Sequence, residues 1–381
     1  MYKPEEFIEE SLVRLAKRDN NLKRSYLYVN PFQGKHIPAD PDHIFLMCKA
    51  LADRLNDKYG GEKLFVIGFA ETATGIAAVI STFLNNVLYY QNTTRESLEN
   101  SEYINFLELH SHAPDQRLYS NGIEEALAAA DRVLIIDDEI STGKTIEHLI
   151  KALREKYNVA DSRFGIASII NSMNDDRLEL FNNSGIDVSF FKKIPYEYRK
   201  DCIEETEFNA ARHLHLEING DVHFKELQFS SKMNPRKTVH FDDYVSDVKK
   251  ASEVICSGLR NRYGKILILG TEEFMFPAIY AGKAVKDRGL AEQVMVHATT
   301  RSPIIASEDS RYPLHIRYEI ASLYDGARRT FIYNLAGYDK VIIITDAERS
   351  GSGINELCSA LQYAENTDIS VLRWTYEECC R

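Results

Sequence analysis

Two adjacent carboxylates at the end of an apolar run are the strongest chemical signal in this chain. Val133 to Ile136 are four aliphatic residues in succession, which predicts a short central strand buried on both faces of a sheet. Asp137 and Asp138 follow directly. At the carboxyl end of a parallel strand, paired acids accept hydrogen bonds from vicinal hydroxyls, such as those of a sugar.

A small, polar turn follows the acids and opens a helix. Beyond it, apolar residues recur at helical spacing, namely Ile146, Leu149, Ile150, Leu153 and Tyr157. The turn therefore lies at a helix N-terminus, where backbone N–H groups and the helix dipole favour an anion. This predicts a phosphate-binding turn made of Ser141, Thr142, Gly143, Lys144 and Thr145.

A nucleotide-triphosphatase loop is the first alternative for this turn. Such a loop needs a glycine five places before Gly143, and that place holds Asp138. A plain surface turn is the second alternative. It explains the glycine and the threonines but not two acids at this offset. The pattern therefore favours a sugar phosphate as the ligand.

The stretch resembles the phosphoribosyl pyrophosphate (PRPP) motif of type I phosphoribosyltransferases: four apolar residues, two acids, three residues, then Thr-Gly-x-Thr. The resemblance implies a phosphoribosyltransferase, a pentosyltransferase within the glycosyltransferases. It would move 5-phosphoribosyl from PRPP to a nitrogen-containing acceptor and release pyrophosphate. Asp137 and Asp138 would hold the ribose hydroxyls, and the segment from Glu139 to Thr145 the 5′-phosphate. Because a multiply charged leaving group travels with a hard cation, Mg²⁺ is expected, with Asp137 and Asp138 as its metal ligands.

Strand and helix patterns alternate from residue 64 to residue 191, which predicts a doubly wound parallel α/β sheet. The predicted strands cover Leu64–Ile67, Val87–Tyr90, Gly165–Ile170 and Val188–Phe191, besides the motif strand. By resemblance, the loop from Gly68 to Gly75 binds pyrophosphate through Ala70, Glu71 and Thr72. Arg95 and a lid over residues 96–121, carrying His110, His112 and Arg117, would complete that pyrophosphate site.

The C-terminal half repeats three segments of the first half in the same order. Lys265–Glu273, Ala298–Pro303 and Lys340–Leu357 match the segments around Leu64–Glu71, Asn92–Arg95 and Arg132–Leu149. This predicts a domain duplication with a second, degenerate α/β copy. Thr345 replaces Asp137 there, so the second copy would not handle PRPP in the usual way. Arg301, Asp346 and Arg349 are candidates for binding another anion or the acceptor; alternatively, they form ion pairs in a structural pseudo-domain.

The run Thr300-Arg301-Ser302-Pro303 resembles the signature of the TRSP domain, which accompanies a phosphoribosyltransferase domain in predicted biosynthetic proteins of tellurium-resistance and stress-response operons. The resemblance implies a protein that makes or modifies a nucleoside-like metabolite. We predict a hood segment over residues 1–62, a phosphoribosyltransferase core over 63–195, an interdomain segment over 196–240 and the second domain over 241–381. We also predict an amphipathic helix over 2–18, a strand over Tyr26–Val29 and a hairpin over Leu214–Leu227.

Composition limits the classes of partner and the location that can be expected for this protein. The 381 residues carry a net charge of −11, which argues against nucleic acid as a partner. No apolar run reaches membrane length, and the six cysteines lack metal-ligand spacing, so reduced thiols and a cytoplasmic location are expected. Ser141 stands where purine-salvage members with a similar turn have Asp, so a 6-oxopurine acceptor is not expected. The acceptor itself is not identified. A PRPP- or nucleotide-binding regulatory protein without transferase activity is the alternative function, and a homodimer is left open.

Overall fold

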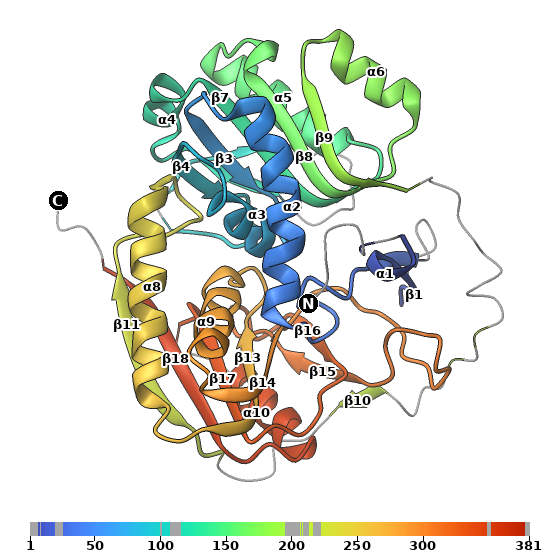
Figure 1. Ribbon diagram of the computed structural model, residues 1–381, viewed down its shortest axis with the longest axis vertical. Coiled ribbons are helices and arrows are strands. Elements are labelled where there is room, and N and C mark those ends of the chain that lie inside the picture. Colours follow the sequence, from blue (N-terminus) through green and yellow to red (C-terminus); the bar gives the residue numbers. More distant parts are fainter. Residues whose placement is uncertain are drawn as a thin grey trace. The chain divides into compact units, whose positions relative to one another are not determined.

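The computed structural model describes residues 7, 9–19, 26–99, 101–106, 116–194, 206, 208, 213–215, 222–348 and 352–377 (Figure 1). The chain forms two compact units. The unit with the paired acids, here called the motif unit, comprises Phe45–Glu197 and Lys232–Asp247. The other, here called the second unit, comprises Met1–Ile44, Tyr198–Ser231 and Val248–Arg381. The division falls within two helices, α2 (Pro41–Tyr59) and α8 (Phe241–Gly258).

The motif unit is built on a sheet whose strands are ordered β12-β4-β3-β7-β8-β9. All neighbours are parallel except β12, which is antiparallel to β4. The order of the parallel strands reverses between β3 and β7, as the doubly wound α/β prediction requires. The strands are β3 (Leu64–Gly68), β4 (Val87–Asn92), β7 (Arg132–Ile140), β8 (Phe164–Asn171), β9 (Asp187–Lys193) and β12 (Val239–His240).

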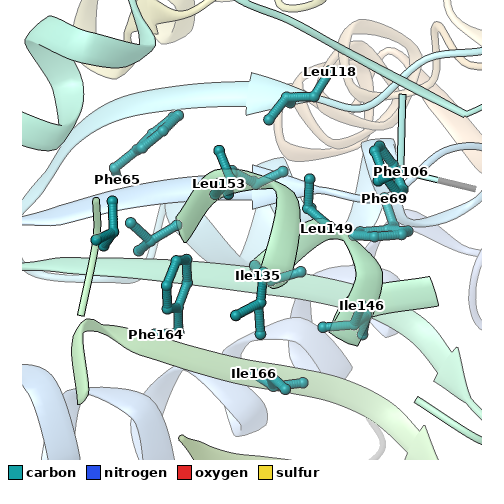
Figure 2. Close-up of a cluster of buried hydrophobic side chains, with 14 of the residues drawn as sticks. Phe65, Phe69, Phe106, Leu118, Ile135, Ile146, Leu149, Leu153, Phe164 and Ile166 are labelled. Atoms are coloured by element: carbon teal, nitrogen blue, oxygen red, sulfur yellow. The ribbon is translucent and has the colours of Figure 1, made fainter. Parts of the chain in front are cut away.

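Helices cover both faces of this sheet. Ile135 of β7 packs with Ile146 and Leu149 of α5 in one buried cluster (Figure 2). The cluster also contains Val133 and residues of α4. On the opposite face, Gly165 of β8 lies against Leu134 and against Tyr59 of α2, while Gly68 of β3 lies against Ala77 of α3. The helices are α3 (Ala73–Ser81), α4 (Ile123–Ala129), α5 (Lys144–Tyr157) and α6 (Asp175–Asn183), with a 3₁₀ turn at Asp161–Arg163.

The second unit contains another parallel sheet, ordered β11-β18-β17-β13-β14. The run β14-β13-β17-β18 of this sheet has the same order as the run β4-β3-β7-β8 of the motif unit. Its strand order also reverses, between β13 and β17. Its helix α10 packs with Leu267 and Leu269 of β13, whereas Gly282 of α9 lies against Ile268 on the other face. The elements are β11 (Lys225–Ser231), β13 (Tyr263–Gly270), α9 (Phe276–Asp287), β14 (Ala291–Ala298), β17 (Lys340–Thr345), α10 (Gly353–Tyr363) and β18 (Ile369–Tyr376).

Smaller sheets complete the described part of the chain. They join β5 (Tyr103–Asn105) to β6 (Arg117–Tyr119), β1 (Arg14–Lys17) to β2 (Tyr26–Val29), and β10 (His213–His215) to β15 (Arg317–Ala321) and β16 (Arg329–Tyr333). None of the described helices is long and apolar enough to cross a membrane. The cysteines at 48, 256 and 358 are buried free thiols.

Two local predictions were wrong. In the segment predicted as one helix over residues 2–18, the described helix α1 covers only Glu9–Leu12, and Arg14–Lys17 is a strand because it pairs with β2 and buries Ala16. The hairpin predicted over Leu214–Leu227 is also absent from the described residues. Its two strands, β10 and β11, pair instead with β15 and β18 in different sheets, and residues 216–221 lie outside the described part.

Candidate active site

The paired acids lie in β7 where the neighbouring strand β3 ends. Gly68 is the last β3 residue in register, opposite Ile136, and the next amide, that of Phe69, donates to the Ile136 carbonyl (2.9 Å). On the other side, β8 continues alongside and pairs Asp137 with Ser168. The acids are therefore held by a strand ladder, which fixes their backbone before any ligand binds.

The Asp137 carboxyl is in an environment that favours its protonated form. Its Oδ1 atom accepts a hydrogen bond from the Asp138 amide (2.9 Å). Burial, followed by the charge of Asp138, raises the pKa of Asp137 well above its ordinary value of 3.8. A ligand that brings hydroxyl donors or a cation would favour the ionised form, so this carboxyl is suited to a polar, positively polarised partner.

The turn after the acids depends on Gly143. This residue has φ of +70° and immediately precedes α5. A Cβ atom there would lie 2.7 Å from Met173 Sδ and 2.9 Å from a Phe181 ring carbon. Glycine is therefore required both by the left-handed backbone and by the close packing. The Thr142 carbonyl accepts a hydrogen bond from Arg177 Nε (3.1 Å), which ties the turn to α6.

The remaining phosphate-turn candidates surround this glycine. Ser141, Thr142, Lys144 and Thr145 are partly or fully exposed, as an anion site requires, while the Glu139 residue is partly buried in β7. The first turn of α5 carries Glu147, whose carboxylate is paired with Arg177 (2.8 Å). The turn thus offers backbone N–H groups and Lys144 at the start of a 14-residue helix.

The loop after β3 lies beside the acids. It contains a cis peptide bond between Ala70 and Glu71, and Thr72 directly precedes α3. The Ala70 amide donates to Thr93 Oγ1 (2.8 Å), and the Ala70 carbonyl accepts from Gln116 Nε2 (2.8 Å). Thr93 Oγ1 in turn donates to Gln116 Oε1 (3.0 Å). These buried hydrogen bonds connect the loop to Thr93, directly after β4, and to Gln116, directly before β6.

Two of the predicted basic residues are near this loop. The Arg95 guanidinium is 3.7 Å from the Glu71 carboxylate, and the backbone of Arg117 makes two 2.9 Å hydrogen bonds with Thr94. The Arg117 side chain instead donates to Ser97 and stacks on the Tyr103 ring. His110 and His112 lie outside the described residues.

The second unit repeats the hydrogen-bond frame of the loop. Thr299 Oγ1 accepts from the Glu272 amide (3.0 Å), as Thr93 does from Ala70, and Arg301 lies 3.6 Å from Glu273. Arg301 also donates to Glu272 (2.7 Å). Asp346 accepts hydrogen bonds from the hydroxyls of Tyr324 and Tyr376 (2.6 and 2.8 Å), and Arg349 lies outside the described residues.

Sequence reasoning missed the residues that hold the loop. Thr93 and Gln116 were not among the predicted site residues. The repeat gave a signal for the threonine, because Thr-Thr-Arg occurs at 93–95 and again at 299–301. Gln116 has no comparable signal. Lys35, in the predicted hood, is fully buried in the second unit and donates to the carbonyls of Glu272 and Thr299 (2.6 and 2.9 Å).

Two family models match the chain. Residues 12–194 match the model described as phosphoribosyl transferase, and residues 233–361 match the model described as TRSP domain C terminus to PRTase_2. The first match gives the class of the part of the chain that carries the paired acids: residues 12–194 form a phosphoribosyltransferase domain. Residues 233–361, which follow this domain, match the TRSP domain model. No curated protein matches the chain.

Similar solved structures are also phosphoribosyltransferases. APRTase from Giardia lamblia, complexed with 9-deazaadenine, is 10% identical, covers 51% of this chain and 100% of its own, and has a TM-score of 0.37. Adenine phosphoribosyltransferase from Rhodothermus marinus is 17% identical, with 48% and 94% covered and a TM-score of 0.34. Orotate phosphoribosyltransferase from Aeropyrum pernix is 14% identical, with 49% and 90% covered and a TM-score of 0.30. The assignment rests on the two family models.

Proposed function

We propose that the motif unit binds PRPP and transfers its 5-phosphoribosyl group to a nitrogen-containing acceptor, releasing pyrophosphate. The observation that carries the proposal is the position of Asp137 and Asp138. They lie near the carboxyl end of β7, directly after Ile136, whose carbonyl accepts a hydrogen bond from the Phe69 amide, and shortly before the glycine turn of α5. Ligands of doubly wound sheets bind where the strand order reverses, which is this position.

Each group in the site has a separate task. The acids accept hydrogen bonds from the ribose hydroxyls and stabilise positive charge on the ribose as the bond at C1 breaks. The Ser141–Thr145 turn holds the 5′-phosphate at the start of α5. Ala70, Glu71, Thr72 and Arg95 receive the departing pyrophosphate, with Arg117, His110 and His112 contributed from the lid. Catalysis then consists of positioning and preorganised electrostatics, since a nitrogen nucleophile needs little activation.

Magnesium fits the donor set of this site. Mg²⁺ prefers oxygen ligands and is usually held by one or two carboxylates together with substrate phosphates. Asp137 and Asp138 supply two adjacent carboxylates, and burial of Asp137 gives that carboxyl a reason to pair with a cation. When bound, Mg²⁺ would neutralise charge on the pyrophosphate oxygens.

The acceptor belongs to the biosynthesis of a nucleoside-like metabolite, in line with the resemblance to proteins of tellurium-resistance operons. Ser141 precedes Thr142 in the turn and is partly exposed, so it offers a neutral hydroxyl rather than a carboxylate to an acceptor. A neutral hydroxyl at this position supports an acceptor other than a 6-oxopurine. The domain duplication is part of the same proposal and is supported by the matching strand orders of the two sheets.

The decisive experiment is calorimetric titration of PRPP, with and without Mg²⁺, into the full-length protein. We expect Mg²⁺-dependent binding that is lost in Asp137→Asn/Asp138→Asn. Asp176→Asn is the matched control, because Asp176 is an exposed carboxylate at the start of α6 and its loss should leave binding unchanged. Once an acceptor is found by pyrophosphate release, removing either acid should lower the rate by about 10²- to 10³-fold.

Absence of PRPP binding to the folded wild-type protein would refute the transferase proposal. Binding of PRPP without pyrophosphate release across a panel of nitrogen acceptors would instead favour the regulatory alternative. In that case ribose phosphates and nucleotides should be titrated next.

A further inference from the structure

The second unit contains a carboxylate, Glu272, that is bound as an external anion would be. The Glu272 side chain is only 1% exposed. Its Oε2 atom accepts from Arg301 Nε (2.7 Å) and from Arg328 (2.9 Å), and its Oε1 atom accepts from Ser322 Oγ (2.5 Å). Two guanidinium groups and a hydroxyl around one oxyanion are the donors that phosphate and carboxylate ligands receive in proteins.

The surrounding frame is the same as in the motif unit. The Thr299 amide donates to the Gly270 carbonyl (3.2 Å), and the Thr93 amide donates to the Gly68 carbonyl (2.9 Å). In each unit the same threonine accepts from the amide two residues after that glycine, which is Glu272 in one and Ala70 in the other. The carboxylate of Glu272 therefore projects from the position where the motif unit has only a methyl group.

The arginine around this carboxylate also has a counterpart. Arg301 follows Thr299 by two residues, as Arg95 follows Thr93. The two arginines make equivalent ion pairs, 3.6 Å from Glu273 and 3.7 Å from Glu71. In the motif unit, the space above Ala70 and beside Arg95 is thus the place that corresponds to the Glu272 carboxylate.

The remaining donors come from a hairpin that is repeated as well. Thr300 forms an antiparallel bridge to Phe331 in the β15–β16 hairpin, and Thr94 forms one to Arg117 in the β5–β6 pair. Ser322 and Arg328 flank the turn between β15 and β16. The second unit therefore holds its hairpin turn directly over the loop after β13, through Glu272.

The same hairpin fills the start of α10. A Cβ atom on Gly353 would lie 2.6 Å from the Ser322 carbonyl and 2.7 Å from the Ala321 carbonyl. The Ala321 amide donates to Glu356 in the first turn of α10 (2.7 Å). Backbone carbonyls of the β15–β16 hairpin thus lie close against the first residue of α10.

We propose that the second unit retains an oxyanion site for a phosphate-class ligand, and that its own Glu272 carboxylate fills this site. An attached carboxylate is present at a high effective concentration, so a free anion at ordinary concentrations cannot displace it. The wild-type second unit consequently binds no phosphate-class ligand, and removing the carboxylate leaves two arginines and a serine able to bind one. This inference does not depend on the function proposed for the motif unit.

The test is calorimetric titration of inorganic pyrophosphate into full-length variants. Asp137→Asn/Asp138→Asn is the background, so that any site in the motif unit is the same throughout. Adding Glu272→Ala should create one additional equivalent of bound pyrophosphate. Its affinity should be at least tenfold higher than that of any pyrophosphate bound by the second unit of the background protein. Adding Glu272→Gln should create none, because the amide keeps the volume and fills the site. Adding Arg301→Ala to Glu272→Ala should remove the new equivalent.

Either of two results would overturn the proposal. One is that Glu272→Ala gains no equivalent of bound pyrophosphate, although its circular dichroism spectrum and cooperative unfolding match those of the background protein. The other is a second equivalent already bound by the wild-type protein and lost in Arg328→Ala. If Glu272→Ala does not fold, the number of pyrophosphate equivalents bound by the wild-type protein is the deciding measurement. We expect one equivalent or none. These differences in bound pyrophosphate between variants would be the same if the motif unit did not bind PRPP.

Discussion

Replacing Gly143 by alanine tests the geometry of the turn on which the site depends. The change adds one methyl group at a position with φ of +70°. A left-handed conformation costs a residue with a Cβ about 1–2 kcal/mol. The methyl group would also lie 2.7 Å from Met173 Sδ and 2.9 Å from the Phe181 ring, so neighbouring atoms must move.

The expected magnitude follows from these two terms. Overpacking of a well-packed site costs about 1–3 kcal/mol. With the backbone term, Gly143→Ala should lower the free energy of unfolding of the motif unit by about 2–5 kcal/mol. Gly185→Ala is the matched control, since Gly185 also has a left-handed φ (+77°) but the nearest atom to its added Cβ is 3.8 Å away. Only the backbone term, about 1–2 kcal/mol, should apply there.

Urea unfolding followed by far-ultraviolet circular dichroism measures both variants. Calorimetry with PRPP supplies a second readout, because a displaced turn should weaken binding by tenfold or more in Gly143→Ala and leave Gly185→Ala unchanged. Equal losses of stability in the two variants, together with equal affinities, would refute the argument that close packing behind Gly143 shapes the turn.

Three further predictions concern buried polar groups. Burial, followed by the charge of Asp138, raises the pKa of Asp137 in the folded protein above the unfolded value near 3.8. The contribution of this carboxyl to the free energy of unfolding is therefore complete below that value and is lost as pH rises. Asp137→Asn should therefore raise the melting temperature at neutral pH and flatten its dependence on pH, and an unchanged profile would contradict this. Thr93→Val leaves the Ala70 amide without its acceptor and should cost about 1–3 kcal/mol in urea unfolding, whereas Thr93→Ser should cost less. Burial lowers the pKa of His297 to about 4, so NMR should find its ring neutral at pH 5.5 or so and stability falling as pH drops below 6.5; a ring that titrates near 6.5 would contradict this.

The sequence predicted the central strands of both sheets well, for a physical reason. β7, β13 and β17 each contain four consecutive aliphatic residues, at Val133–Ile136, Ile266–Leu269 and Val341–Ile344, as strands buried on both faces of a sheet typically do. The paired acids and the turn after them could be predicted because the chemistry lies within one contiguous segment. The roles of the predicted site residues stay predictions until ligand binding is measured.

Features that depend on distant partners could not be predicted. β10 and β11 look like a hairpin locally, but their partners are 104 and 145 residues further along the chain, counting from His213 to Arg317 and from Lys225 to Ser370. The amphipathic pattern of the N-terminal segment did not reveal that Arg14–Lys17 pairs with β2. The sequence likewise placed Glu272 beside Glu273 without indicating which of them Arg301 would contact most closely.

The hydrogen bond between the Asp138 amide and Asp137 Oδ1 makes the strand end a spectroscopic reporter. Beyond Gly68 no residue of β3 is in register with β7, and this amide is satisfied by the carboxylate next to it. Any ligand or proton that engages Asp137 must therefore alter the shielding of the Asp138 amide proton. In a ¹⁵N-labelled sample, the chemical shift of that single amide would follow both the ionisation of Asp137 and the occupancy of the site.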